Sequence, residues 1–311
     1  MQKLVLGDLL MYSSYFAPRG RNRMYMLGQQ LSERYLSPLD RLIGIIGDAG
    51  AGKSSLVKGM FPGLELTNDD DGVNIRPLPL LKNIDRGFFT SHTYHVDIRF
   101  EMAFTQPHIL AEAVEQALAH DKRVIVEHFD LLYPIRKHNA DVMIGVGGEV
   151  IVVRPTVFGP FPQEIRDVVN KTLQYRKMAH TAEDLTNRVL VEDYGAILPF
   201  KHRDVHHGFV LEYPMILSAD LKEVERKVKQ IIDEGLPISY CDEAHIHIGK
   251  NIWACSGPRT HVRNTEEIEN FRLLHDYTYD PKTKSYLVIG LVGTTAVNLD
   301  GFAVLNNGIN L

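Results

Sequence analysis

The chain has 311 residues, of which 44% are hydrophobic and 23% charged, which is the composition of an ordinary globular protein of about two domains. Its formal net charge of −5 excludes a strongly basic nucleic-acid-binding arm, and its two cysteines exclude a disulfide framework and fit a reducing cytoplasm. No apolar run approaches the ~18 residues of a membrane span, and residues 1–14 lack a small-residue cleavage site, so we expect neither a membrane anchor nor a signal peptide.

The first half of the chain alternates expected strands and helices. An apolar run at 42–46 predicts a buried strand, and a helix is expected to start at Lys53. The pattern continues with a helix at 107–122 and with strands within 123–130, 140–146 and 149–155. Such alternation is typical of a parallel sheet covered by helices, so residues 1–160 are predicted to form an α/β domain. The Pro- and Gly-rich segment 154–162 marks the predicted boundary.

The turn after the first of these strands reads GDAGAGKSS. Gly47, Gly52, Lys53 and Ser54 fill every fixed position of the pattern GxxxxGK[ST]. In that pattern backbone N–H groups surround phosphate oxygens at a helix N-terminus, the lysine adds a positive charge, and the hydroxyl is a ligand for Mg²⁺. We therefore expect ATP or GTP to bind with Mg²⁺ on Gly47, Asp48, Ala49, Gly50, Ala51, Gly52, Lys53, Ser54 and Ser55.

Acidic residues at the carboxyl ends of strands are candidate catalytic residues, because ligands of such sheets bind at that edge. Glu127 ends the segment RVIVE and is predicted to hold the Mg²⁺ of the nucleotide, directly or through water. Asp69, Asp70 and Asp71 are expected to follow a short strand and are candidate bases that accept a proton from an acceptor hydroxyl. A turn is the alternative interpretation of this acidic run, because Asp-Asp-Gly is ordinary turn chemistry.

The order of phosphate loop, helix, DDDG segment and the strand VIVEHFD resembles the uridine kinase and phosphoribulokinase group over roughly residues 40–150. The resemblance implies a P-loop kinase domain that uses ATP to phosphorylate a small alcohol. It also implies that Asp69, Asp70 or Asp71 is the base and that Glu127 is the metal acid. The sequence departs from the group at His128, where the group has glycine, and it lacks an arginine-rich lid.

The second half mixes helices and strands in a less regular order. A long helix is expected at 163–194, a charged helix at 220–235, and strands within 208–217, 244–249, 270–275 and 285–293. This mixture predicts an α+β domain over residues 161–311.

Four side chains of this half form a candidate metal site. His180 and Asp184 are four residues apart and share one face of the expected helix, whereas Cys255 and His261 lie in a Gly-Pro loop. Imidazole, carboxylate and thiolate are all zinc ligands, so His180, Asp184, Cys255 and His261 are predicted to converge on Zn²⁺. One alternative is a surface hydrogen bond between His180 and Asp184 without a metal ion. Another is a metal site in which His245 or His247 takes the place of His261.

The segments HTAEDLTNRVL and CSGPRTHVRNTEEIENFRLL resemble the editing (second additional) domains of threonyl- and alanyl-tRNA synthetases and their free-standing relatives, from about Arg176 to Leu274. The resemblance implies hydrolysis of wrongly charged tRNA at this site and, in the alanyl branch, bound zinc. Asp184 stands where that family has its second histidine, and Arg259 and Thr260 lengthen the loop between Cys255 and His261.

Three functions follow from these patterns. The leading hypothesis is a cytoplasmic, ATP-binding phosphotransferase whose second domain recognises a small amino-acid-like or nucleoside-like acceptor. The first alternative is an aminoacyl-tRNA deacylase with a regulatory nucleotide-binding domain, and the second is a nucleotide-gated sensor. The net charge favours a small-molecule partner over tRNA.

Overall fold

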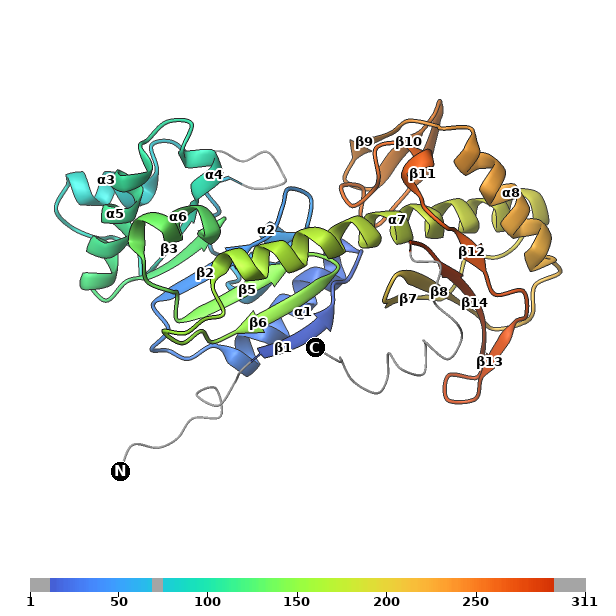
Figure 1. Cartoon of the computed structure of the whole chain (residues 1–311), viewed down its shortest axis with the longest axis horizontal. Helices are drawn as coiled ribbons and strands as arrows, with labels where there is room; N and C mark the ends of the chain where they lie inside the picture. Colours follow the sequence, from blue (N-terminus) through green and yellow to red (C-terminus); the bar gives the residue numbers. More distant parts are fainter. Residues whose placement is uncertain (1–11, 69–74, 294–311) are drawn as a thin grey trace. The chain divides into compact units, whose positions relative to one another are not determined.

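The computed structural model describes residues 12–68 and 75–293, which divide into two compact units, Met1–Leu173 and Gln174–Leu311 (Figure 1). The division falls inside one continuous helix, α7 (Pro162–Tyr194), whereas the sequence placed the boundary before this helix begins. Among the described residues, no helix is both long and apolar enough to cross a membrane.

A six-stranded sheet forms the centre of the first unit. Its strands are β1 (Tyr12–Phe16), β2 (Leu42–Ile46), β3 (Thr93–Asp97), β4 (Arg123–Glu127), β5 (Val142–Val146) and β6 (Glu149–Val153), in the spatial order β1-β6-β5-β2-β4-β3. Strands β3, β4, β2 and β5 are parallel, but β6 runs antiparallel to β5, and β1 runs antiparallel to β6. The predicted parallel sheet is therefore confirmed for four strands, and the sheet as a whole is mixed. A tight turn at Gly147 and Gly148 returns the chain directly, without the helix that a parallel connection requires.

Helices cover both faces of this sheet (Figure 1). They are α1 (Arg21–Tyr35), α2 (Lys53–Met60), α3 (Pro79–Asp85), α4 (Ile98–Glu101), α5 (Pro107–Ala119) and α6 (Phe129–Arg136). Alternate residues of β2 point to opposite faces, so Leu42 and Ile46 pack with α5 and α6, while Ile43 and Ile45 pack with α1 and α2. The sheet is buried on both sides, which explains why its central strands are almost wholly apolar.

Helices α1 and α2 approach each other closely where each presents a glycine. A Cβ atom on Gly28 would lie 2.3 Å from the carbonyl oxygen of Leu56, and one on Gly59 would lie 2.0 Å from that of Tyr25. Both distances are far below van der Waals contact, so only a hydrogen atom fits in place of a side chain at these positions.

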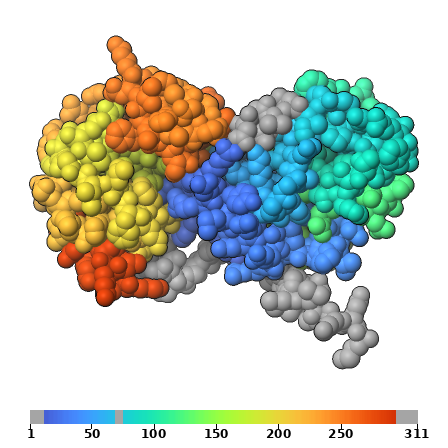
Figure 2. All heavy atoms as spheres, turned by 180° about the vertical axis from the view of Figure 1, so that it is seen from behind, coloured from blue at the N-terminus to red at the C-terminus, as the bar shows by residue number. Residues whose placement is uncertain are grey.

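α1 lies on the surface of its unit in the space-filling view, in dark blue (Figure 2).

The sequence patterns missed several elements of this unit, including helices α3, α4 and α6. Strand β1 and helix α1 lie in a segment whose pattern predicted no element, and β3 was not expected. The chain from Leu64 to Asn68 is not one of the sheet's strands, so the expectation of a strand before the acidic run is wrong. Asp69, Asp70 and Asp71 themselves lie outside the described residues.

The second unit packs the C-terminal half of α7 and helix α8 (Leu221–Asp233) against antiparallel sheets. One sheet has the order β12-β14-β8-β7 with β13 beside β14, and the other has the order β11-β10-β9. Their bounds are β7 (Lys201–Val205), β8 (Gly208–Tyr213), β9 (Ile238–Asp242), β10 (His245–Ile248), β11 (Asn251–Ala254), β12 (Arg272–Leu273), β13 (Thr278–Asp280) and β14 (Ser285–Leu291). The core contains Leu185 and Val189 of α7, Phe209 and Leu211 of β8, and Val228 of α8.

Candidate functional site

The predicted phosphate loop connects the end of β2 with the start of α2. Gly47, Gly50 and Gly52 have φ values of 152°, 75° and 91°, a region that side chains disfavour. A Cβ atom on Gly47 would also lie 2.4 Å from the carbonyl oxygen of Val146. The three glycines therefore allow a turn that leads directly into α2, which begins at Lys53 as the sequence predicted.

Lys53 and Ser54 lie at the edge of the sheet where the parallel strands end, and both are 7% exposed. The Lys53 Nζ atom donates a hydrogen bond to the carbonyl oxygen of Asp48 at 3.2 Å and lies 3.7 Å from Oε2 of Glu127. The lysine, the hydroxyl and the strand-end carboxylate are thus neighbours.

Glu127, at the end of β4, is held by a histidine of the adjacent strand. His95 Nε2 lies 3.2 Å from Glu127 Oε1, and the backbone N–H of Thr67 donates to His95 Nδ1 at 3.1 Å. Because Nδ1 accepts, the neutral ring carries its proton on Nε2 and donates it to the carboxylate. Burial by itself would raise the pKa of Glu127, but the hydrogen bond from His95 and the charge of Lys53 outweigh it and lower that pKa.

A carboxylate that the sequence analysis did not select ends the neighbouring strand β3. Asp97 pairs in register with Glu127, is 7% exposed, and accepts hydrogen bonds from the backbone N–H of Phe100 at 3.1 Å and from Nδ2 of Asn68 at 3.0 Å. As with Glu127, the sequence signal is an acid at the end of a strand, but His95 and Thr93 interrupt the apolar pattern of TYHVD and conceal that strand. Asn68, the residue before the predicted acidic run, therefore lies beside Asp97 at the carboxyl end of β3.

His128 follows Glu127 in a left-handed conformation, with φ of 56°. Burial and the nearby charge of Lys53 lower the pKa of His128 to about 4. Its ring is therefore neutral at pH 7. Arg99, just after Asp97, forms an ion pair with Asp48 of the phosphate loop at 2.7 Å.

In the second unit, the four predicted metal ligands converge. One donor atom each from His180, Asp184, Cys255 and His261 lies within 4.8 Å of the other three. Cys255 Sγ is 3.5 Å from Nε2 of His180 and 3.1 Å from Nε2 of His261, which in turn is 3.6 Å from Oδ2 of Asp184. Tetrahedral Zn²⁺ with bonds of ~2.0–2.3 Å requires ligand atoms roughly 3.3–3.8 Å apart. The three separations above, 3.1 to 3.6 Å, lie near this range, and pairs as far apart as the limit of 4.8 Å would have to move closer to hold the ion.

Both histidines point their Nε2 atoms into the cluster because their Nδ1 atoms have acceptors elsewhere. His180 Nδ1 lies 3.1 Å from the carbonyl oxygen of Thr260. His261 Nδ1 lies 3.2 Å from Oγ1 of Thr181. The Thr181 hydroxyl donates its own proton to the carbonyl oxygen of Lys177 and also accepts a hydrogen bond from the backbone N–H of Val262. Each Nδ1 must therefore be the donor, and each Nε2 offers a lone pair, the arrangement usual for metal-bound histidines.

The lengthened loop keeps its histidine in the cluster. Thr260, one of the two extra residues, supplies the carbonyl that orients His180, and its N–H donates to the carbonyl oxygen of Gly257 at 2.9 Å. His245 instead lies against Asp242, with 2.8 Å between Nδ1 and Oδ1. Neither His245 nor His247 is part of the described cluster.

The cluster is buried, which sets the charge of its groups. Burial, together with the nearby carboxylate of Asp184, raises the pKa of the Cys255 thiol, and burial lowers the pKa of His261 to about 3. A divalent cation would favour the thiolate and the neutral imidazole, since both are the metal-binding forms. With thiolate and carboxylate bound, Zn²⁺ would leave the buried site without net charge.

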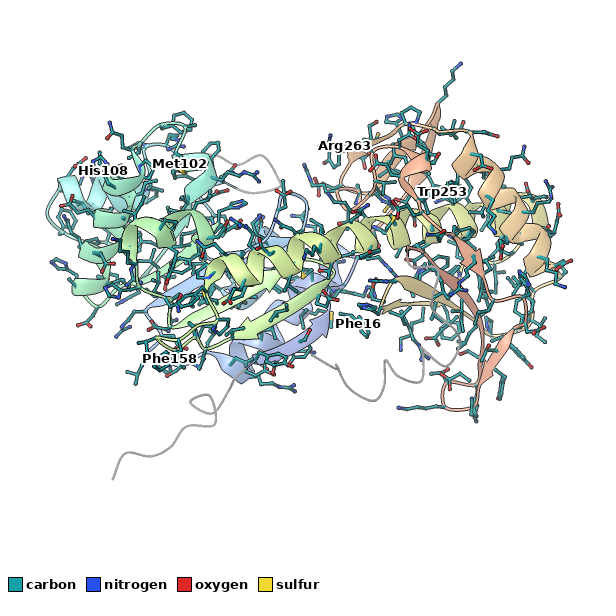
Figure 3. The ribbon with its side chains drawn as sticks, in the orientation of Figure 1. Phe16, Met102, His108, Phe158, Trp253 and Arg263 are labelled. Carbon is teal, nitrogen blue, oxygen red and sulfur yellow. The ribbon has the colours of Figure 1, made fainter. Side chains whose placement is uncertain are left out.

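The remaining residues considered from the sequence lie outside this cluster. Trp253 belongs to β11 (Figure 3) and packs partly against the hydrophobic core. The guanidinium of Arg188 lies 5.9 Å from the centre of the Trp253 ring.

A scan against protein-family models matches none, and a search of curated proteins finds no match.

Proposed function

We propose that the first unit binds MgATP or MgGTP on Gly47–Ser55 and transfers the terminal phosphoryl group to a hydroxyl of a small molecule. The observation that carries this proposal is that Lys53, Ser54, Glu127 and Asp97 meet at one edge of the sheet, beside a helix N-terminus.

Each residue has a distinct role in this proposal. Lys53 would neutralise charge on the terminal phosphate, Ser54 would contribute a ligand for Mg²⁺, and Glu127 would hold the ion directly or through water. Asp97 accepts the proton of the acceptor hydroxyl while its oxygen bonds to phosphorus and the bond to the leaving diphosphate breaks. Asp97 takes this role because it lies in register with Glu127 on the adjacent strand.

The test is release of nucleoside diphosphate in the presence of nucleosides, sugars and amino alcohols. Lys53→Ala should abolish nucleotide binding in calorimetry, and Asp97→Asn should keep binding but lower acceptor-stimulated turnover ~10²–10⁴-fold. Asp167→Asn, on the exposed face of α7, is the control and should change neither. Unchanged nucleotide affinity in Lys53→Ala would contradict the binding site. No stimulation by any acceptor would contradict the transferase and favour a nucleotide-gated sensor.

A second candidate function, Zn²⁺ binding in the second unit, is favoured by the convergence of four donor atoms. Four protein ligands complete a tetrahedral shell, whereas a hydrolytic zinc site keeps one position open for water. We therefore place metal binding ahead of tRNA deacylation for this unit. Elemental analysis should find about one zinc per chain and a loss in Cys255→Ala. Release of the amino acid from mischarged tRNA by the purified protein would reverse this preference.

A further inference from the structure

A cavity of about 410 Å³ opens at the edge of the first unit's sheet where β3 and β4 begin. Its lining includes Leu36 after α1, Phe61 after α2, Thr93 at the start of β3, and the arginines Arg41 and Arg123. The volume falls within the usual range for small-molecule sites, which is ~300–1,000 Å³. The cavity is separate from the proposed nucleotide site, because β4 runs from Arg123 at this edge to Glu127 at the opposite edge.

Arg123 is held rigidly at this cavity by backbone carbonyl groups. Its Nε atom donates to the carbonyl oxygen of Asp40 at 2.8 Å, and its Nη2 atom donates to that of Ser37 at 3.1 Å. Its guanidinium carbon lies 5.7 Å from the ring centre of Phe61. These contacts fix the positive charge and leave Nη1 available, since no described residue accepts a hydrogen bond from it.

Among residues 12–68 and 75–293, no carboxylate lies within ion-pair distance of the Arg123 guanidinium. Asp40, the nearest acid in sequence, directs its carboxylate to Arg154 at 2.7 Å. Asp121 also lines the cavity, but within the described part of the chain it forms no ion pair with either arginine. Arg41 likewise has no side-chain partner among the described residues, so neither of the two guanidinium groups at this cavity forms an ion pair with a described carboxylate. Burial lowers the pKa of Arg123; the charge of Asp40 opposes this shift, and the charge of Arg41 adds to it.

We propose that this cavity binds a small organic oxyanion, a phosphate monoester or a carboxylate that carries a planar apolar group. Arg41 and the free Nη1 edge of Arg123 face the anion, because guanidinium groups bind these oxyanions through paired hydrogen bonds. The apolar group lies against Leu36, Met60 and Phe61, which form the nonpolar wall. A bound anion also removes the unfavourable interaction between the two arginines.

Calorimetric titration with phenyl phosphate, benzoate and inorganic phosphate tests the proposal. We expect phenyl phosphate or benzoate to bind at millimolar or lower concentration, and Arg41→Gln to weaken binding at least about tenfold. Phe61→Leu should weaken the aromatic probes but leave inorganic phosphate unchanged, which separates the apolar wall from the charge. Arg41→Gln should fold normally, since its side chain has no partner among the described residues.

The Lys53→Ala protein is the matched control, because it removes the lysine of the phosphate loop and leaves the cavity intact. Equal affinity for the aromatic probe in Lys53→Ala and in the wild type supports the cavity, and this comparison does not depend on phosphoryl transfer. Loss of binding in Lys53→Ala would place the probe in the phosphate loop and overturn the proposal. Absence of binding to the wild type at about 10 mM, or full affinity in Arg41→Gln, would overturn it as well.

Discussion

His95 donates its Nε2 proton to Glu127 across 3.2 Å, and the backbone N–H of Thr67 at Nδ1 makes this the favoured neutral tautomer. The hydrogen bond from the ring therefore stabilises the ionised form of Glu127 and fixes the orientation of its carboxylate toward Lys53. A carboxylate that is 2% exposed would otherwise favour its neutral form.

His95→Leu should weaken Mg²⁺-dependent nucleotide binding about 10–100-fold, because the carboxylate of Glu127 loses the hydrogen bond from His95. His95→Gln, whose amide also donates, should restore most of the affinity. Measuring affinity against pH separates positioning from simple damage: in His95→Leu the acid limb moves to higher pH, since the pKa of Glu127 rises. An acid limb that does not move would contradict the role of His95.

Thr181→Val should lower zinc affinity about 10–100-fold while keeping all four ligands, because valine has the same shape but cannot accept the proton of His261. Thr186→Val is the matched control: Thr186 is also fully buried on α7, but its hydroxyl donates only to the carbonyl oxygen of Ala182. Competition with a chelator measures both variants. Equal affinities would show that Thr181 does not support the site.

His128 should make the first unit less stable as the pH falls. Its pKa is about 4 in the folded protein against an ordinary value of 6.5, so the unfolded state binds more protons between these values. Stability is therefore fully present above about pH 6.5 and decreases toward pH 4, by on the order of 3 kcal/mol. Lys53 and Arg99 lower this pKa, while Asp97 and Glu127 raise it.

Denaturant unfolding at pH 7 and pH 5 measures this effect in His128→Asn, since asparagine tolerates the left-handed backbone and does not titrate. The variant should lose less stability than the wild type on acidification. His108→Asn, an exposed position on α5, is the control and should behave like the wild type (Figure 3). Identical pH dependence in wild type and His128→Asn would refute the prediction.

Gly59→Ala should destabilise the first unit by at least ~1–3 kcal/mol, because the added carbon would overlap the carbonyl oxygen of Tyr25 and force α1 away from α2. Gln30→Ala, at an exposed position of α1, should cost little. Thermal unfolding compares the two. A normal midpoint for Gly59→Ala would mean that the helices are not in this close contact.

The elements that the sequence predicted well are those whose pattern is local. The apolar run 42–46 and the glycine turn before Lys53 specify a strand, a loop and a helix within a short segment. Strand β3 was missed because His95 and Asp97 interrupt its apolar pattern, and these side chains are satisfied by Thr67 and Phe100, partners that no local pattern reveals.

Local sequence patterns identified the ligands of the candidate metal site but not the groups that orient them. The spacing of His180 and Asp184 and the loop from Cys255 to His261 named its four ligands. Neither Thr181 nor the carbonyl of Thr260 was named, because a backbone carbonyl carries no sequence signal and a threonine in a helix is usually unremarkable.

The glycine contact between α1 and α2 also predicts which residues distant relatives of this chain must retain. A substitution at Gly28 or Gly59 cannot be repaired by one change elsewhere, since the obstructing atoms, carbonyl oxygens of Leu56 and Tyr25, belong to the backbone and are present whatever residue stands there. A homologue that retains this helix pair should therefore carry glycine at both positions even where its surface has diverged. The pair offers a criterion for recognising kinship that is independent of the phosphate-loop motif, which unrelated proteins also contain.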